Sequence, residues 1–207
     1  MMMEATAGQN RAGLRTYLEY AKRFLFAVSP SRRLQKRRAA PLQTADMIRA
    51  KEWVMSRLKV GDKAPSFSLE DQNGRMVSLA DFRGTKLLLY FYPKADTPGC
   101  TRQACSVRDA AESLQESGAA AVGISPDAPD KQKKFDNKYN LGFPLLSDPD
   151  HKVAAVYGVW GKKSLYGRSY EGVVRSSFLI DEDGKVLQAT YGVKPEDTVP
   201  KAQEVLA

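Results

Sequence analysis

Hydrophobic and polar positions follow a regular order from about residue 60 onward. Two continuous apolar runs, Lys86–Tyr92 (KLLLYFY) and Ala119–Ser125, are typical of strands that are buried on both faces. Amphipathic stretches follow these runs and predict helices from about Cys100 to Ser117 and over Pro129–Tyr139. The second of these helices has proline in its first turn, where the missing N–H costs nothing. The order therefore indicates strands that alternate with helices.

Shorter alternating segments predict two antiparallel hairpins, each built around a turn that ends in glycine. Asn73-Gly74 and Asp183-Gly184 tolerate the positive φ angles that such turns require. The paired strands are expected at Ser66–Leu69 with Met76–Leu79, and at Ser176–Asp181 with Lys185–Tyr191. Short helices are expected at Lys152–Tyr157 and Pro195–Leu206. These elements favour a mainly parallel sheet that is covered on both faces and finished by an antiparallel hairpin, an α/β class.

The N-terminal part of the chain has a different composition. Helices are predicted for Leu14–Val28 and Thr44–Arg57. Residues 1–45 hold nine Lys and Arg but only two acidic residues, so they carry seven of the eight net positive charges of the chain. The basic pI of 9.4 therefore describes this segment more than the rest. We expect a basic extension over 1–57, disordered or partly helical, and one domain over 58–207.

The bulk composition limits the chemistry. The chain has 207 residues, of which 43% are hydrophobic and 27% charged, an ordinary globular balance. Two cysteines exclude a disulfide scaffold, and together with the single histidine, His151, they disfavour a closed four-ligand zinc site. No apolar run approaches the ~18–20 residues that span a membrane. Redox chemistry is the more natural use for the two cysteines.

Cys100 lies where chemistry is expected in an open α/β sheet, just beyond the carboxyl end of a buried strand. Near a helix N-terminus, free N–H groups and the helix dipole favour a thiolate. A thiolate attacks the O–O bond of a peroxide and becomes a sulfenic acid. The Thr97 hydroxyl could contact the thiol or the peroxide, and Pro93 and Pro98 restrict the loop. The alternative is a buried, inert cysteine.

Cys105 follows five residues later, on the same predicted helix. Five helical residues rise about 7.5 Å, whereas a disulfide needs Cα atoms within about 6.8 Å. If Cys105 reacts with the sulfenic acid, the first turns of the helix must therefore unwind; otherwise Cys105 only fills the core. Arg175, just before the strand that begins at Ser176, is a candidate cation for the thiolate and the peroxide. A surface position is the more common one for an arginine.

Several stretches resemble one protein family. Pro93-x3-Thr97-x2-Cys100 resembles the active-site signature of peroxiredoxins, and YFYPKADTPGCTRQAC resembles their bacterioferritin comigratory protein / peroxiredoxin Q subfamily. VGDKAPSFSLEDQNG, VGISPDAPDKQKKF, FPLLSDPD and RSSFLIDEDGKV agree with this subfamily. The similarity runs from about Leu58 to the C-terminus.

The resemblance implies a thioredoxin-like fold of the peroxiredoxin type, with a central mixed sheet flanked by helices and an N-terminal β-hairpin. It implies an antioxidant enzyme that reduces hydrogen peroxide and organic hydroperoxides. Cys100 would be the peroxidatic cysteine and Cys105 the resolving one, with Pro93, Thr97 and Arg175 as supporting residues. The implied reductant is thioredoxin or a similar dithiol. The implied protein is a monomer that needs no metal or organic cofactor.

Alternatives stay open for the extension and for the activity. Residues 1–57 could be an organellar transit peptide, although only two serines precede residue 56, or a true basic extension. Such an extension could anchor the chain to nucleic acid or an anionic membrane, whereas neither partner is expected for the domain over 58–207. The third possibility is that the natural protein begins at Met55. We expect either this start or a disordered N-terminal tail, and a cytoplasmic bacterial protein. A thiol redox sensor with little turnover is the alternative activity. A disulfide oxidoreductase is disfavoured because the chain has no C-x-x-C.

Overall fold

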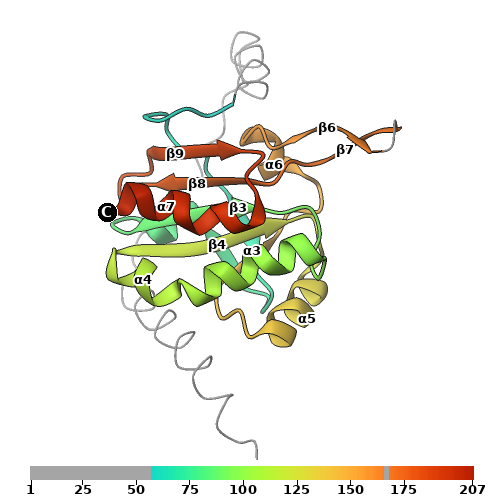
Figure 1. The fold of residues 1–207 in the computed structure, drawn as a ribbon, viewed down its shortest axis with the longest axis horizontal. Helices are drawn as coiled ribbons and strands as arrows, with labels where there is room; N and C mark the ends of the chain where they lie inside the picture. Colours follow the sequence, from blue (N-terminus) through green and yellow to red (C-terminus); the bar gives the residue numbers. More distant parts are fainter. Residues whose placement is uncertain (1–56, 166–167) are drawn as a thin grey trace, which may run out of the picture.

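A five-stranded mixed sheet forms the centre of the protein. The structure is a computed structural model that describes residues 57–165 and 168–207. The strands follow the order β5-β4-β3-β8-β9 across the sheet (Figure 1). Their bounds are β3 (Lys86–Phe91), β4 (Ala119–Ser125), β5 (Leu145–Ser147), β8 (Ser176–Ile180) and β9 (Val186–Tyr191). The expected central mixed sheet is confirmed.

The expected antiparallel hairpin that finishes the sheet, β8–β9, is confirmed, but parallel pairs do not outnumber antiparallel ones. β3 pairs in parallel with β4, and β4 with β5, whereas β3 pairs antiparallel with β8, and β8 with β9. The additional antiparallel pair arises because β8 joins the sheet beside the central strand β3 and runs opposite to it. Leu89 consequently has a parallel neighbour, Val122, on one side and an antiparallel neighbour, Phe178, on the other.

Helices cover the sheet on both faces. Side chains of α3 (Pro98–Asp109), α4 (Ala111–Glu116), α5 (Pro129–Tyr139) and α7 (Thr198–Leu206) pack in one buried cluster with Leu88 and Tyr90 of β3. Leu87, Leu89 and Phe91 point to the other face and pack with α6 (Lys152–Val156). Short 3-10 turns are η1 (Leu79–Phe82) and η2 (Pro195–Asp197). Alternate residues of β3 therefore serve two separate cores.

The helix predicted from Cys100 to Ser117 differs from the observed one. It begins two residues earlier, at Pro98, and is divided at Ala110 into α3 and α4. The carbonyl groups of Ser106 and Arg108 accept the N–H of Ala110, which closes α3. β4 and α5 have the predicted bounds.

Two small hairpins complete the described domain. β1 (Ser68–Glu70) and β2 (Met76–Ser78) form the expected N-terminal hairpin. At its turn the Asp71 carboxylate accepts the N–H groups of Asn73 and Arg75 at 2.7 and 2.9 Å, and Gly74 has φ of 76°. The antiparallel hairpin of β6 (Trp160–Leu165) and β7 (Arg168–Val173) projects from the sheet (Figure 1) and was not predicted.

The helices predicted before Arg57, and the extension that holds them, lie outside the described residues. Within the described ranges, no helix is both long enough and apolar enough to cross a membrane.

Candidate functional site

Cys100 lies in the first turn of α3, directly beyond the carboxyl end of β3. Thr97 is the N-cap residue with extended backbone angles, and Pro98 is the first helical residue. Cys100 is therefore the third residue of the helix, and its side chain packs in the core, with 1% of the residue exposed. The first N–H groups of a helix have no intrahelical acceptor, so they place partial positive charge near the sulfur. The sequence prediction of a cysteine at a strand–helix junction is confirmed.

Arg175 contacts the sulfur directly. Its Nη2 donates to Cys100 Sγ at 3.3 Å, and its Nη1 donates to Gln103 Oε1. The Arg175 carbonyl accepts the Val193 N–H at 3.0 Å, which fixes the backbone between β7 and β8. A Cβ atom at Gly99 would lie 3.2 Å from Arg175 Nη2. The glycine therefore leaves the room that the guanidinium occupies beside the sulfur.

Gln103 is a part of this arrangement that was not predicted from the sequence. Its side chain is fully buried, and its Nε2 donates to Thr198 Oγ1 at 2.8 Å. Gln103 therefore joins α3 and the start of α7 while it holds one arm of Arg175. The available signal was its position three residues after Cys100, because residues at this spacing share a helix face. An uncharged polar residue on a face with Ala104 and Val107 requires a buried partner.

Pro93 and Thr97 lie in the loop between β3 and α3. Pro93 is half-buried, and the Thr97 hydroxyl donates to the Lys94 carbonyl at 3.0 Å. That hydroxyl therefore closes the loop, and among the described residues it makes no hydrogen bond to Cys100. Of the two roles expected for this hydroxyl, a contact with the thiol is not seen among the described residues, and donation to a peroxide would require the proton to leave the Lys94 carbonyl.

Cys105 lies on the same continuous helix as Cys100. Both thiols are free; Cys105 is half-buried and packs against the cluster that contains Cys100. α3 runs without interruption from Pro98 to Asp109. The helical rise separates the two cysteines by about 7.5 Å along the axis, whereas a disulfide needs Cα atoms within about 6.8 Å. The two cysteines therefore cannot form a disulfide in this conformation.

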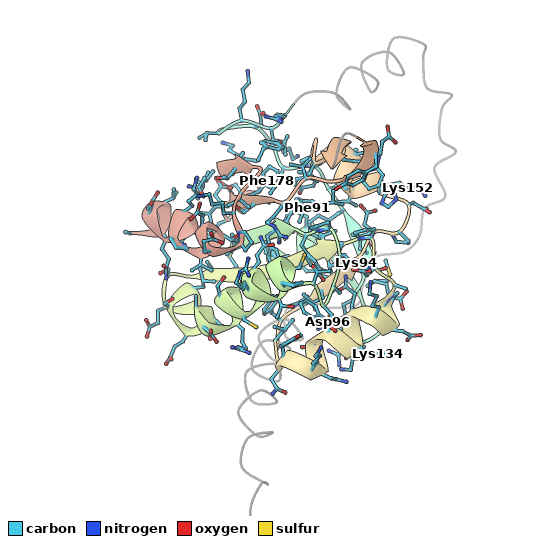
Figure 2. All side chains as sticks on the ribbon, turned by 45° about the vertical axis from the view of Figure 1, so that its right-hand side comes forward. Phe91, Lys94, Asp96, Lys134, Lys152 and Phe178 are labelled. Atoms are coloured by element: carbon cyan, nitrogen blue, oxygen red, sulfur yellow. The ribbon has the colours of Figure 1, made fainter. Side chains whose placement is uncertain are left out.

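Two aspartates attach the loop before Cys100 to the neighbouring helix α5. Asp127 Oδ2 accepts the Ala95 N–H at 2.5 Å. Asp96 has φ of 58°, and its carboxylate accepts both Lys138 Nζ, at 2.9 Å to each oxygen, and Tyr139 Oη, at 2.8 Å. The hydrogen bond from Lys138 lowers the pKa of Asp96. Figure 2 shows Asp96 and Lys94 at the side of the loop that faces α5.

An aromatic layer lies beneath α3 and α5. Tyr90 and Tyr92 stack with ring centroids 5.6 Å apart, and both are fully buried. Burial is the main cause that raises the pKa of each phenol well above its usual value. The Tyr92 hydroxyl donates to Gln132 Oε1 on α5. Both phenols are therefore neutral in the folded protein. They pack in the same buried cluster as Ala95 of the loop and Cys100.

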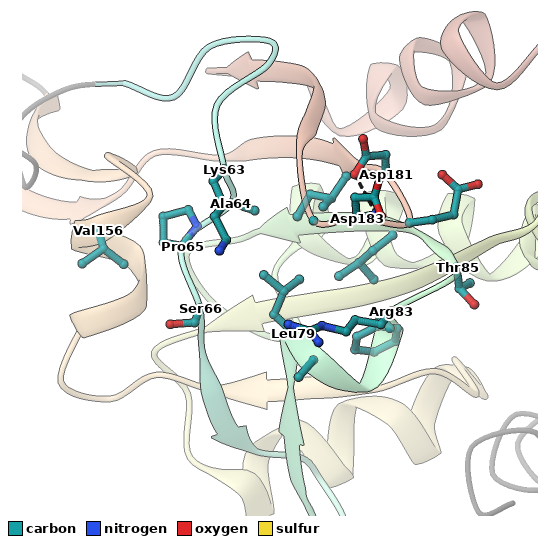
Figure 3. A pocket seen from close by; sticks show the side chains of 16 residues that line it. Lys63, Ala64, Pro65, Ser66, Leu79, Arg83, Thr85, Val156, Asp181 and Asp183 are labelled. Carbon is teal, nitrogen blue, oxygen red and sulfur yellow. Dashed lines mark hydrogen bonds between the residues drawn. The ribbon is translucent and has the colours of Figure 1, made fainter. Parts of the chain in front are cut away.

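A cavity of about 500 Å³ lies at the opposite end of β3 (Figure 3). Its walls come from the segment 63–66, η1 and the turn between β8 and β9, and Leu87 near the start of β3 lines it too. None of the five predicted site residues lines this cavity. The described residues contain no group of three His, Cys, Asp or Glu that could hold a metal ion.

Comparisons with known proteins agree on one family. The model of the AhpC/TSA family matches residues 60–189. Peroxiredoxin Bcp of Escherichia coli is 54% identical over 132 residues, which cover 64% of this chain and 85% of that protein. Peroxiredoxin Bcp of Bacillus subtilis is 44% identical over 149 residues, which cover 72% of this chain and 95% of that protein.

Solved structures give the same result for the fold. The crystal structure of peroxidoxin BcpB from Mycobacterium tuberculosis superposes with a TM-score of 0.65 at 39% identity, covering 72% of this chain and 97% of that one. The bacterioferritin comigratory protein of Xanthomonas campestris, described for its alkyl peroxide reduction activity, has a TM-score of 0.61 at 32% identity. That match covers 68% of this chain and 87% of the other.

Proposed function

Because the chain belongs to the AhpC/TSA family, in its Bcp and peroxiredoxin Q branch, and is therefore a thiol peroxidase, we propose that Cys100 is its peroxidatic cysteine. The observation that carries the proposal is the 3.3 Å contact between Arg175 Nη2 and Cys100 Sγ. A permanently charged donor at this distance stabilises negative charge on the reacting atoms. It also faces the place where a peroxide oxygen would take up charge.

In the proposed reaction, the Cys100 thiolate attacks one oxygen of a hydroperoxide ROOH. The S–O bond forms as the O–O bond breaks, the sulfur is oxidised to a sulfenic acid, and the leaving alkoxide takes a proton to become ROH. Arg175 stabilises the negative charge that moves from sulfur to the leaving oxygen. Pro93 and Thr97 shape the loop that faces the peroxide. Hydrogen peroxide and organic hydroperoxides both fit this chemistry.

Cys105 completes the proposed cycle. Its thiol attacks the sulfenic acid, a Cys100–Cys105 disulfide forms, and the oxygen leaves as water. Since both cysteines lie on the uninterrupted α3, the first turns of the helix must unwind before the sulfur atoms can meet. Thioredoxin or a similar dithiol then reduces the disulfide and becomes oxidised itself. Under this proposal neither a metal nor an organic cofactor takes part.

The remaining parts of the proposal concern the setting of the enzyme. We propose a monomer, with an antioxidant role in the bacterial cytoplasm and a catalytic domain over 58–207. The relatives from Escherichia coli and Bacillus subtilis, matched over most of their length, support the choice of domain and setting.

The test is peroxide consumption by the full chain with thioredoxin, its reductase and NADPH. Cys100→Ser is expected to abolish turnover. Cys105→Ser is expected to stop the cycle after one peroxide per chain, because its sulfenic acid has no internal partner. Normal steady-state turnover by Cys100→Ser would refute the assignment. A wild-type chain that is oxidised readily but turns over hardly at all would favour a thiol redox sensor.

A further inference from the structure

The loop between β3 and α3 has one main-chain attachment to a buried carboxylate. The Ala95 N–H donates to Asp127 Oδ2 at 2.5 Å, and Ala95 is 2% exposed and packs in the same cluster as Cys100. Ala95 lies five positions before Cys100, in the loop that leads from β3 to α3. A buried N–H without an acceptor is costly, and the loop therefore depends on this carboxylate.

Asp127 itself is held rigidly. Its backbone N–H donates to Ser125 Oγ at 3.1 Å, and its carbonyl accepts the Ser147 hydroxyl at 2.7 Å. Its carboxylate accepts the Ser125 hydroxyl at 3.1 Å and the ammonium group of Lys131 on α5. The Asp127 side chain is only 10% exposed. The acceptor for the loop is thus fixed to β4, β5 and α5 at once, and it does not touch Cys100 or Arg175.

We propose that Asp127 is a positioning residue for the peroxidase reaction, which holds the loop so that the first turn of α3 keeps Cys100 beside Arg175. The inference rests on the proposed function of Cys100. While the bond to Ala95 is intact, the thiol stays at the guanidinium and reacts with peroxide. When the loop leaves Asp127, the start of α3 is free to unwind and Cys100 can reach Cys105.

The second aspartate of this region provides a matched contrast. Asp96 and Lys138 also join the loop to α5, but their side chains are 43% and 57% exposed. Exposed ion pairs contribute little, because water and salt screen them. The hydrogen bond to Asp127 is less exposed, since Ala95 is 2% exposed and the Asp127 side chain 10%, and it satisfies a main-chain donor of the loop. Asp127, not Asp96, is therefore expected to decide how long the loop stays in place.

Loss of the Asp127 carboxylate should affect oxidation of Cys100 and formation of the disulfide differently. Removing the carboxylate should slow the first step, because Cys100 spends less time beside Arg175. It should not slow the second step, in which Cys105 attacks the sulfenic acid, because that step already requires the loop to leave. A residue that merely supports the fold would slow both steps or neither.

The kinetic test uses Asp127→Ala, with Asp127→Asn as the conservative variant and Lys138→Gln as the control. Rapid mixing with hydrogen peroxide and quenched mass spectrometry follow sulfenic acid and disulfide separately in the full chain. For Asp127→Ala we expect oxidation of Cys100 to be about tenfold slower or more, with disulfide formation at least as fast as in the wild type. Asp127→Asn keeps an oxygen acceptor for the Ala95 N–H and should restore most of the oxidation rate. Lys138→Gln should change either rate less than about threefold.

Hydrogen exchange of the reduced protein tests the loop without any peroxide chemistry. Asp127→Ala should raise the exchange of amides in residues 93–105 about tenfold or more, with exchange in β3 and β4 unchanged. Unchanged exchange in 93–105, a uniform increase over the whole domain, or parallel slowing of both chemical steps would overturn the proposal. If the wild-type chain consumed no peroxide, the proposed function would fail, but the exchange experiment would still show whether Asp127 holds the loop.

Discussion

Gln103→Met tests whether the buried amide holds Arg175 against the thiol. Methionine has nearly the same length and volume as glutamine, so the core between α3 and α7 stays filled. The substitution removes the acceptor for Arg175 Nη1 and the donor to Thr198 Oγ1. The guanidinium then keeps Cys100 as its partner but loses the group that fixes its other arm.

The expected magnitudes follow from these two hydrogen bonds. A bond to a charged group contributes about 1.5–3 kcal/mol and a neutral one about 0.5–1.5 kcal/mol. The apolar methionine recovers part of this in a site that is 0% exposed, so the free energy of unfolding should fall by about 1–3 kcal/mol. If the transition state for peroxide reduction loses about 1.5–3 kcal/mol of stabilisation by Arg175, oxidation of Cys100 slows about tenfold to a hundredfold.

The assay is the second-order rate of Cys100 oxidation, measured well below the melting temperature, together with urea unfolding. Gln72→Met is the matched control. Gln72 is also a buried glutamine, 4% exposed, with hydrogen bonds to Phe143 O at 2.9 Å and from Leu145 N at 2.8 Å. The control should lose stability but keep its oxidation rate. Equal oxidation rates in both variants and the wild type would refute the role given to Gln103.

Three further predictions concern Arg175, Gly123 and the buried tyrosines. Arg175→Lys should slow peroxide consumption about a hundredfold, because an ammonium group does not present two fixed donors to two partners; a stopped-flow rate near that of the wild type would contradict this. In Gly123→Ala the new Cβ would lie 2.8 Å from Tyr90 Oη, so urea unfolding should show a loss of about 1–3 kcal/mol. Burial raises the pKa of Tyr90, Tyr92 and Tyr157, so the folded state keeps these protons where the unfolded state releases them. Stability should therefore be constant with respect to these groups below about pH 10 and fall as the pH rises further, with phenolate absorbance appearing on unfolding.

Elements with a clear local pattern of apolar residues or helix-capping residues could be predicted from the sequence. The continuous apolar run of β4 and the proline-led α5 were predicted with their observed bounds, because local burial and capping decide them. β5 has only three residues, all buried, at the edge of the central sheet beside β4, and so short a segment gives no local pattern. The β6–β7 hairpin is held by pairing between its own strands, and its sequence does not alternate apolar and polar residues. The place of β8 beside β3 is a property of the whole sheet.

The residues of the candidate site likewise fall into those with a local sequence signal and those that depend on tertiary contacts. Cys100 and Thr97 belong to one contiguous stretch, and their place at a strand–helix junction follows from it. Arg175 lies 75 residues from Cys100; the sequence offered it as a candidate cation, but the family resemblance distinguished it from the other basic residues. Gln103 and Asp127 act through partners that are distant in sequence, for Gln103 a threonine 95 residues away. Such contacts depend on the packed tertiary structure, so a single sequence can indicate that Gln103 needs a buried partner but does not identify that partner.

The mass of the peroxide-treated full chain, recorded with and without thiol alkylation, tests the central claim most directly. We expect a loss of two hydrogens with no thiol left to alkylate, and a disulfide-linked peptide pair containing Cys100 and Cys105. We also expect that Cys105→Ser instead yields a sulfenic acid on Cys100. A treated chain in which Cys100 keeps a free, unoxidised thiol would contradict the account.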